Sequence, residues 1–85
     1  MYKVVYLDRI EEDLKRLSKS LTRKILDRIE THLAKDPHVL GKPLKGYFHG
    51  YWRYRYGDYR VIYKIAEKEI LIIVLRVGHR SSIYE

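Results

Sequence analysis

The sequence predicts a small α+β domain with the element order β-α-α-β-β-β, in which a helical hairpin covers one face of a mostly antiparallel sheet. Three observations predict this class: a Val- and Tyr-rich segment at the N-terminus, two amphipathic segments after it, and three strand-like segments separated by turn residues. The chain has 85 residues, which is enough for one hydrophobic core. We therefore expect a single domain over residues 1–85.

The N-terminal part predicts a strand and a short helix. Residues 2–7 contain the Val and Tyr residues that favour a pleated strand. Asp8 and Glu11 have the spacing of a capping box, and the three acids of residues 11–13 suit the positive end of a helix dipole. The short helix that follows has an apolar stripe of Ile10, Leu14 and Leu17.

A second, longer helix is predicted after a polar break. Ser18 or Ser20 is placed to cap its first turn. The helix is expected to run to about Lys35, because Asp36 and Pro37 end it. Its apolar stripe repeats every four residues and consists of Leu21, Ile25, Ile29 and Leu33. The two helices are expected to form an antiparallel hairpin.

The second half predicts a loop and then three strands. Residues 38–50 contain three glycines and are expected to form the loop. Gly57 and Asp58 are typical of a two-residue hairpin turn. The last strand looks buried on both faces, because it is almost continuously apolar. The predicted strands span residues 51–56, 59–65 and 70–77.

Positive charge is concentrated in the same half. The net charge is +7, and residues 37–85 hold nine basic and four acidic residues together with seven of the nine tyrosines. Basic residues mixed with aromatic ones favour a nucleic-acid surface, through phosphate attraction and base stacking. The alternative is an ordinary solvated basic face.

The sequence lacks the residue types that several kinds of catalysis and cofactor binding require. The chain has no cysteine, which excludes a disulfide framework, a thiolate zinc site and a cysteine nucleophile. It has no His-Glu-x-x-His motif, no carboxylate cluster and no Gly-rich phosphate loop, so we expect no metal and no cofactor. No apolar run is long enough to span a membrane and no signal-peptide pattern is present, so a cytoplasmic protein without a membrane partner is expected.

The predicted hairpin separates the side chains into two faces. With a turn at 57–58, Arg55 faces Arg60. An aromatic face suited to the core carries Trp52, Tyr54, Tyr56, Tyr59, Val61 and Tyr63. The other face carries Arg53, Arg55, Arg60 and Lys64, with Tyr51 and Ile62 among them. Like charges that face each other cost ~0.2–1 kcal/mol per pair. The pattern therefore favours a site for an anionic ligand, best a phosphodiester, over a face where arginine is merely tolerated.

Two further side chains can carry a proton. His79 follows the last strand, beside Arg80, and imidazole titrates near neutral pH. Tyr84 is the other candidate. The structural alternatives are a histidine without catalytic function and a tyrosine that packs the C-terminus. His32 and His38 have weaker cases, and His49 is an outside candidate.

The order and spacing of several motifs resemble one family over nearly the whole chain. These motifs are the Leu-Lys-Gly element at 44–46, the Tyr-Trp-Arg-Tyr-Arg strand at 51–55, the Gly-Asp-Tyr-Arg-Val-Ile-Tyr hairpin at 57–63, and the Val-Gly-His-Arg ending at 77–80 followed by Tyr84. They resemble the RelE/ParE toxin superfamily, and its RelE branch most. The resemblance implies a compact microbial RNase fold and a toxin that cleaves messenger RNA in the ribosomal A site. Cleavage would need no metal and would proceed by 2′-hydroxyl attack, leaving a 2′,3′-cyclic phosphate and inhibiting translation.

The resemblance also implies site residues and partners. By motif position, the catalytic residues are Arg53, Arg55, Arg60, Arg80 and Tyr84. His79 is added to them as a candidate because its imidazole can carry a proton. Contacts to messenger or ribosomal RNA are expected from Lys42, Lys45, Tyr51 and Lys64. The expected partners are a cognate acidic antitoxin, the 30S A site with its 16S ribosomal RNA, and messenger RNA. The toxin alone is expected to be monomeric, and to form a hetero-oligomer with its antitoxin.

Two departures from the best-known members change the expected chemistry. They carry lysines where this chain has Arg53 and Arg55, and arginine does not lose its proton at neutral pH. The general base is therefore expected to be His79 or Tyr84. In addition, no C-terminal helix follows Tyr84, so regulation that relies on such a helix is not expected.

Three other functions remain open from the sequence. A ParE-type toxin shares the fold but inhibits DNA gyrase by binding it. A nucleic-acid-binding module without catalysis, or a degenerate toxin that only binds its antitoxin, would also fit the basic face. The substitutions Arg53→Ala and His79→Ala separate these readings, because they abolish cleavage only in a nuclease.

Overall fold

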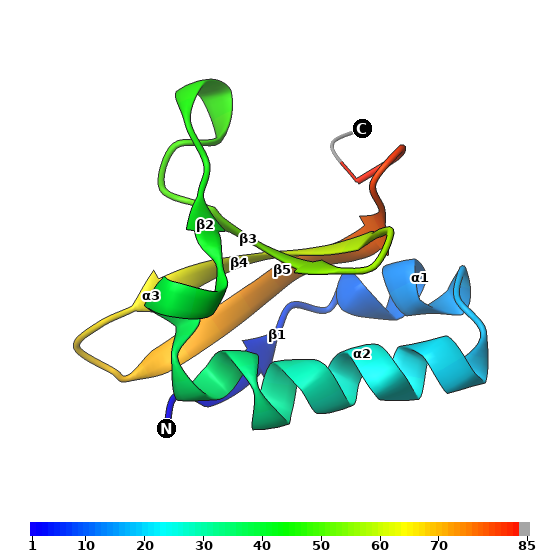
Figure 1. The fold of residues 1–85 in the computed structure, drawn as a ribbon, viewed down its shortest axis with the longest axis horizontal. Helices are drawn as coiled ribbons and strands as arrows, with labels where there is room; N and C mark the ends of the chain where they lie inside the picture. Colours follow the sequence, from blue (N-terminus) through cyan, green and yellow to red (C-terminus); the bar gives the residue numbers. More distant parts are fainter. Residues whose placement is uncertain (84–85) are drawn as a thin grey trace.

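A five-stranded sheet in the order β1-β5-β4-β3-β2 forms the centre of the fold (Figure 1). The structure is a computed structural model and describes residues 1–83. β1 runs parallel to β5, and every other neighbouring pair is antiparallel. The strands are β1 (Lys3–Tyr6), β2 (Lys42–Pro43), β3 (Trp52–Tyr56), β4 (Tyr59–Ala66) and β5 (Leu71–His79). The predicted α+β class is confirmed.

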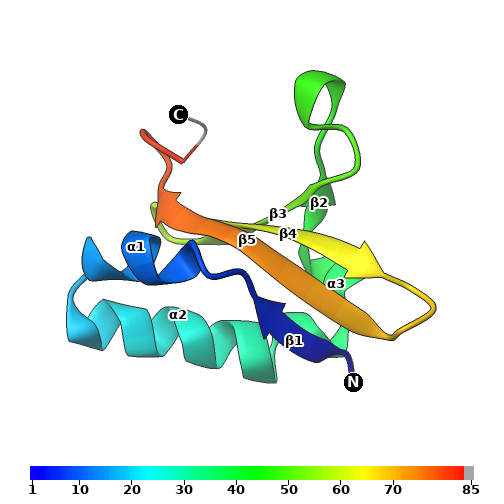
Figure 2. The same ribbon diagram turned by 180° about the vertical axis from the view of Figure 1, so that it is seen from behind.

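Two helices cover one face of this sheet, as Figures 1 and 2 show from opposite sides. They are α1 (Ile10–Lys15) and α2 (Lys19–Thr31). Most of the predicted apolar stripe is buried: Ile25 and Ile29 of α2, and Leu33 just after the helix, are at most 1% exposed, whereas Leu21 is partly exposed. They pack in one core with sheet residues that include Val61, Tyr63, Ile72, Val74 and Val77. No helix within residues 1–83 is long and apolar enough to cross a membrane.

The helix ends differ in part from the prediction. Ser18 caps α2, since its Oγ accepts the N–H of Leu21 at 3.1 Å. The predicted capping box at α1 is wrong: its N-cap is Arg9, no side chain caps it, and the N–H of Glu11 bonds to the backbone carbonyl of Asp8. α2 also ends at Thr31, before the expected residue, because the chain tightens into the 3₁₀ turn η1 (Leu33–Lys35).

The predicted loop holds three short elements instead. Pro37 begins a further helix, α3 (Pro37–Leu40), with its fixed φ suited to a first helical turn. β2 and the 3₁₀ turn η2 (Gly46–Phe48) follow. The helix α3 is held down by Tyr63, whose buried hydroxyl donates to the carbonyl of Pro37 at 2.6 Å. Gly41 passes so close that a Cβ there would lie 1.8 Å from this hydroxyl oxygen.

The β3–β4 hairpin has the predicted register, with Trp52 opposite Tyr63 and Arg55 opposite Arg60. The last strand differs from the prediction. It begins at Leu71, because Ile70 has a left-handed φ of 51° in the preceding turn, and it extends to His79. A bulge leaves Leu75 without a directly facing residue, since Val74 pairs with Tyr63 and Arg76 with Ile62.

Two segments rise on the side of the sheet away from the helices (Figures 1 and 2). One is the arm of residues 44–51, which is closed at its base by a bond from the N–H of Leu44 to the carbonyl of Tyr51, 2.9 Å long. The other is the chain after β5, described as far as Ile83. We call the sheet surface between them the open face.

Candidate nucleic-acid interface

The open face carries the basic side chains that the sequence predicted for it. Tyr54 and Tyr63, which alternate with them, are buried in the core on the helical side. Arg55 and Lys64 are exposed, and Arg53 is partly exposed. The division of the hairpin into an aromatic core face and a basic open face is confirmed.

Arg60 departs from the expected exposed position. It is only 8% exposed, and its Nη1 donates to the carbonyls of Gly57 at 2.9 Å and Tyr59 at 3.1 Å. Arg60 thus folds back onto the hairpin turn, while Arg55 opposite it remains in solvent. This arrangement separates the two facing charges and uses one of them to hold the turn.

Three cations gather at the edge of the open face. Lys42 on β2 pairs in register with Arg53 on β3. These two residues line one hollow together with Arg55 and Leu40. No acid occurs in the sequence between Asp36 and Asp58, so this hollow is a region of positive potential.

Arg80 lies beside the turn of the same hairpin. Its backbone N–H donates to the carbonyl of Asp58 at 2.8 Å. Its Nε lies 3.8 Å from an Asp58 carboxylate oxygen, and both side chains are well exposed, so this ion pair contributes little. The backbone bond therefore brings Arg80 to the corner of the sheet that also carries Arg55 and Arg60.

His79 directly precedes Arg80 in the chain, but it lies on the other face of the sheet from Arg53 and Arg55. Its ring contacts Tyr59 edge-on, with centroids 5.4 Å apart, and it shares a small cavity with Asp13 and Leu17 of the helical layer. The bulge explains this placement: the buried residues of β5 change from Val74 to Val77, which reverses the alternation before His79.

The hydrogen bonds of His79 fix its tautomer. Its Nδ1 accepts the backbone N–H of Ser81 at 3.1 Å and lies 2.7 Å from the Ser81 hydroxyl. A backbone N–H can only donate, so the neutral imidazole carries its proton on Nε2. Its carbonyl also accepts the N–H groups of Ser82 and Ile83. His79 therefore organises the turn that presents Arg80.

The other predicted site residues lie on or near the arm. Lys45 is exposed at the start of η2. Tyr51 ends the arm, and the Nζ of Lys64 lies 4.8 Å from the centroid of its ring. Tyr84 lies outside the described residues. Among residues 1–83, no group of three or more His, Asp or Glu side chains is placed to hold a metal ion.

Asp13 is a polar residue whose role the sequence did not reveal. It is 4% exposed, and its carboxylate accepts from the Arg76 guanidinium at 3.0 and 3.3 Å and from the N–H of Val77 at 2.9 Å. β1 pairs with β5 only as far as Val74. Beyond that point α1 covers the strand edge, and Asp13 takes the place of a neighbouring strand. Its acidic neighbours gave it the appearance of a helix-dipole residue.

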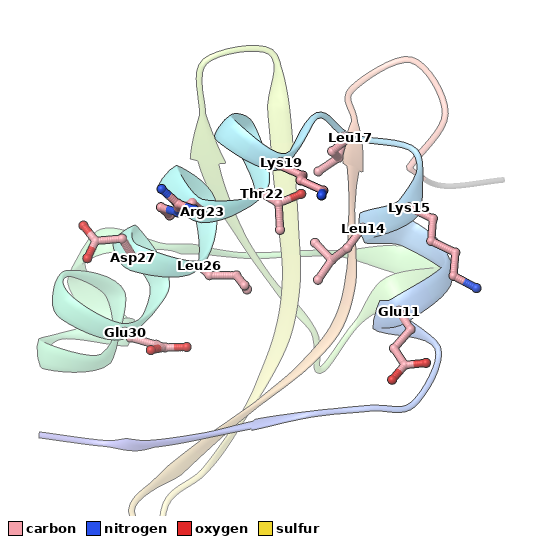
Figure 3. Close-up of a pocket in the computed structure, with 10 residues that line it drawn as sticks. All are labelled: Glu11, Leu14, Lys15, Leu17, Lys19, Thr22, Arg23, Leu26, Asp27 and Glu30. Atoms are coloured by element: carbon pink, nitrogen blue, oxygen red, sulfur yellow. The ribbon is translucent and has the colours of Figure 1, made fainter.

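A second surface lies on the helical side, between α1 and α2 (Figure 3). Leu14, Leu17 and Leu26 provide its apolar part, and charged residues such as Arg23 and Asp27 surround it. We call this surface the hairpin groove. It lies apart from the basic open face.

Comparison with known proteins agrees with this fold. Residues 4–84 match the model of a family described as the ParE toxin of a type II toxin–antitoxin system. The chain belongs to the RelE/ParE family of toxins. Two relatives from Mycobacterium tuberculosis are similar over almost the whole chain. Toxin RelG is 30% identical over 83 residues, which cover 98% of this chain and 95% of the relative. Toxin RelE is 31% identical over 83 residues, which cover 98% of this chain and 86% of the relative.

Solved structures of RelE-type toxins resemble this toxin closely. A chain of the toxin–antitoxin complex RelBE2 from Mycobacterium tuberculosis superposes with a TM-score of 0.88 at 29% identity, covering 93% of this chain and 98% of that one. A chain of the RelB–RelE complex from Methanococcus jannaschii gives 0.71 at 30% identity, with 94% of each chain covered. The intact Escherichia coli RelBE complex, at 15% identity and a TM-score of 0.76, supports the fold alone. The resemblance to the superfamily is confirmed.

Proposed function

We propose that this toxin is an endoribonuclease that cleaves messenger RNA in the ribosomal A site and so inhibits translation. The observation that carries the proposal is the corner of the open face, where Arg55, Arg60 and Arg80 come together beside the hollow of Lys42 and Arg53. Guanidinium groups suit a phosphodiester, because they stay charged and donate several hydrogen bonds in a plane.

The proposed reaction needs only phosphate binding and proton transfer. The 2′-oxygen of the messenger attacks the adjacent phosphorus, the bond from phosphorus to the 5′-oxygen breaks, and a 2′,3′-cyclic phosphate remains. The 2′-hydroxyl gives up a proton and the leaving oxygen gains one. Arg80 and Arg55 would stabilise the charge that builds on the phosphate, and Arg53 and Lys42 would hold the neighbouring backbone. Arg60 would act with them from the turn that its Nη1 holds.

The tautomer and placement of His79 narrow the choice of proton carrier. The neutral ring uses Nδ1 to hold Ser81 and already carries a proton on Nε2, and it lies on the helical side. We therefore assign proton transfer to Tyr84 and give His79 a positioning role through Arg80. The substitution His79→Ala is expected to lower kcat and to leave the shape of the pH–rate profile unchanged. If His79→Ala instead removed the pH dependence on one side of that profile, His79 would be the proton carrier.

Cleavage with programmed ribosomes and with free messenger tests the proposal. The wild-type toxin should cut only in the A-site codon, only with ribosomes, and leave a 2′,3′-cyclic phosphate. Arg80→Ala should lower the single-turnover rate about hundredfold, as loss of one transition-state donor does. Lys24→Ala, an exposed position on α2, is the matched control and should cleave normally. A folded wild-type protein that cuts in neither condition would refute the nuclease.

Inhibition of DNA gyrase is the second candidate function, because the description of the matching family names the ParE toxin. A supercoiling assay with purified gyrase decides it. Inhibition by the wild type and equally by Arg80→Ala, without messenger cleavage, would establish the ParE-type function. The nuclease hypothesis predicts that the toxin has no effect on DNA supercoiling by gyrase.

The expected partner is a cognate acidic antitoxin, with which the toxin would form a hetero-oligomer in the cytoplasm. Two similar structures were solved as toxin–antitoxin complexes. Acidic side chains of such a partner would neutralise the open face, and apolar ones would fill the hairpin groove of Figure 3. Co-purification with the product of a neighbouring short acidic reading frame, with loss of cleavage, is the expected result.

A further inference from the structure

An aromatic groove lies between the arm and the open face. Three arm residues, Tyr47, Phe48 and Tyr51, line one side of it, and Ile62 and Leu75 line the sheet side, with Arg76 also at the groove. Ile62 pairs in register with Arg53, so the groove opens on the same face as the proposed phosphate site. The cleavage chemistry assigned above makes no use of Tyr47 or Phe48.

Tyr47 is the most exposed aromatic side chain among residues 1–83, at 94%. Its ring meets that of Phe48 edge-on, with centroids 5.2 Å apart. An aromatic ring held so far into solvent stabilises the fold little, because it buries almost no apolar surface. Its position suits a ligand better than a core.

The arm is preorganised by its own backbone. Besides the bond at its base, the N–H of Tyr51 donates to the carbonyl of Phe48 at 3.1 Å, and the N–H of His49 donates to that of Gly46 at 3.0 Å. Gly46 and Gly50 supply the left-handed φ values of 63° and 97° that these turns require. A ring on such a scaffold loses little conformational entropy when a ligand stacks on it.

The charge beside the groove defines the ligand further. Lys64 stands over the ring of Tyr51, and Lys45 precedes the tip of the arm. The arm and its flanks have no acid between Asp36 and Asp58. Flat rings together with exposed cations fit a polyanion that carries flat rings of its own, which is a single-stranded nucleic acid. An acidic peptide would match the charge but would leave the stacking surface of Tyr47 unused.

We propose that the aromatic groove binds one unpaired RNA nucleobase, stacked on Tyr47, while the phosphates on either side contact Lys45 and Lys64. The inference rests on the proposed function in that it takes the ligand to be RNA. The base belongs either to the messenger or to ribosomal RNA, and the experiment separates the two. The groove thereby anchors RNA away from the scissile phosphate, at the arm rather than at the hairpin corner.

Fluorescence anisotropy with a labelled short oligoadenylate tests the messenger. Tyr47→Ala should raise the Kd about tenfold, the usual loss for one stacked base, whereas Tyr47→Phe should keep the wild-type Kd because the ring remains. Val39→Ala is the matched control, since Val39 is an apolar residue that is 74% exposed outside the groove. An abasic oligomer of the same length should bind wild type and Tyr47→Ala equally. Binding of an oligoglutamate that responds to Tyr47→Ala, when oligoadenylate binding does not, would overturn the proposal in favour of a peptide.

Binding to vacant ribosomes without messenger tests the other source. A tenfold loss there for Tyr47→Ala, with oligoadenylate binding unchanged, assigns the base to ribosomal RNA and supports the groove. Unchanged binding to both RNAs refutes the groove, even if the wild type cleaves messenger as proposed. Conversely, a wild-type protein that does not cleave, but binds oligoadenylate through Tyr47, keeps the groove and refutes the nuclease.

Discussion

The two sides of the sheet treat charged and polar groups in opposite ways. On the helical side, the Asp13 carboxylate accepts three hydrogen bonds from Arg76 and Val77. The buried hydroxyl of Tyr63 donates a hydrogen bond to the Pro37 carbonyl. On the open face, cation faces cation: Lys42 pairs in register with Arg53. Within residues 1–83, no buried side-chain polar atom lacks a hydrogen bond.

This difference separates stability from function. A buried charge needs a partner of opposite charge, because removing that partner lowers the free energy of unfolding by about 3 kcal/mol. An exposed cluster of like charges costs far less and provides a field that attracts an anion. Substitutions on the helical side should therefore act on the free energy of unfolding, and those on the open face on RNA binding and cleavage.

The largest effect on stability is expected from Asp13→Ala. It leaves the Arg76 guanidinium and the Val77 N–H without their carboxylate in a largely buried place, which should lower the free energy of unfolding by about 3 kcal/mol. Urea unfolding followed by circular dichroism measures the change. Exposed Asp27→Ala on α2 is the control and should change it by less than about 0.5 kcal/mol. Equal, small effects of both would show that the pair adds no stability.

The Asp13–Arg76 pair also shows where sequence reasoning ends. Its members are 63 positions apart, and only packing of α1 on the free edge of β5 joins them. The hairpin register was predictable, because the Gly57–Asp58 turn and the alternation on either side of it are local. The position of His79 was not, since one extra residue at the bulge of Leu75 reverses the alternation.

The same limit applies within the site. The alternation of side chains between the two faces of a strand correctly predicted that Arg53 and Arg55 lie on the open face, because it depends only on position along the strand. It could not show that Arg60 would fold onto the turn carbonyls, which depends on the shape of that turn. β2 has only two residues, too few for a pattern, and it exists because it pairs with β3.

A smaller effect is expected from Tyr63→Phe, and it depends on pH. Loss of the bond to the Pro37 carbonyl should lower the free energy of unfolding by about 1 kcal/mol near neutral pH. Burial raises the pKa of the Tyr63 phenol above its ordinary value of 10.0. The folded protein thus holds this proton more tightly than the unfolded chain, so the contribution is complete below about pH 10 and is lost as pH rises above it.

Urea unfolding at about pH 8 and about pH 11 measures this dependence. The wild type should lose more stability between the two than Tyr63→Phe, which has no phenol at this position. The Tyr63→Phe variant should still lose some stability, because it keeps Tyr6, whose pKa is likewise raised by burial and by its bond to Glu30. Equal losses in wild type and Tyr63→Phe would contradict a shifted Tyr63.

The smallest effect on stability, with the opposite sign, is expected from Arg55→Gln. It removes one of the two facing arginines of the hairpin and so should raise the free energy of unfolding by about 0.5 kcal/mol. The same change removes a proposed phosphate donor, and single-turnover cleavage should fall about hundredfold. Lys24→Gln, which removes the same charge from the exposed side of α2, should change neither quantity appreciably. A variant that is both more stable and less active would show that the charge conflict is kept for its ligand, whereas a destabilised Arg55→Gln would mean that this arginine supports the fold.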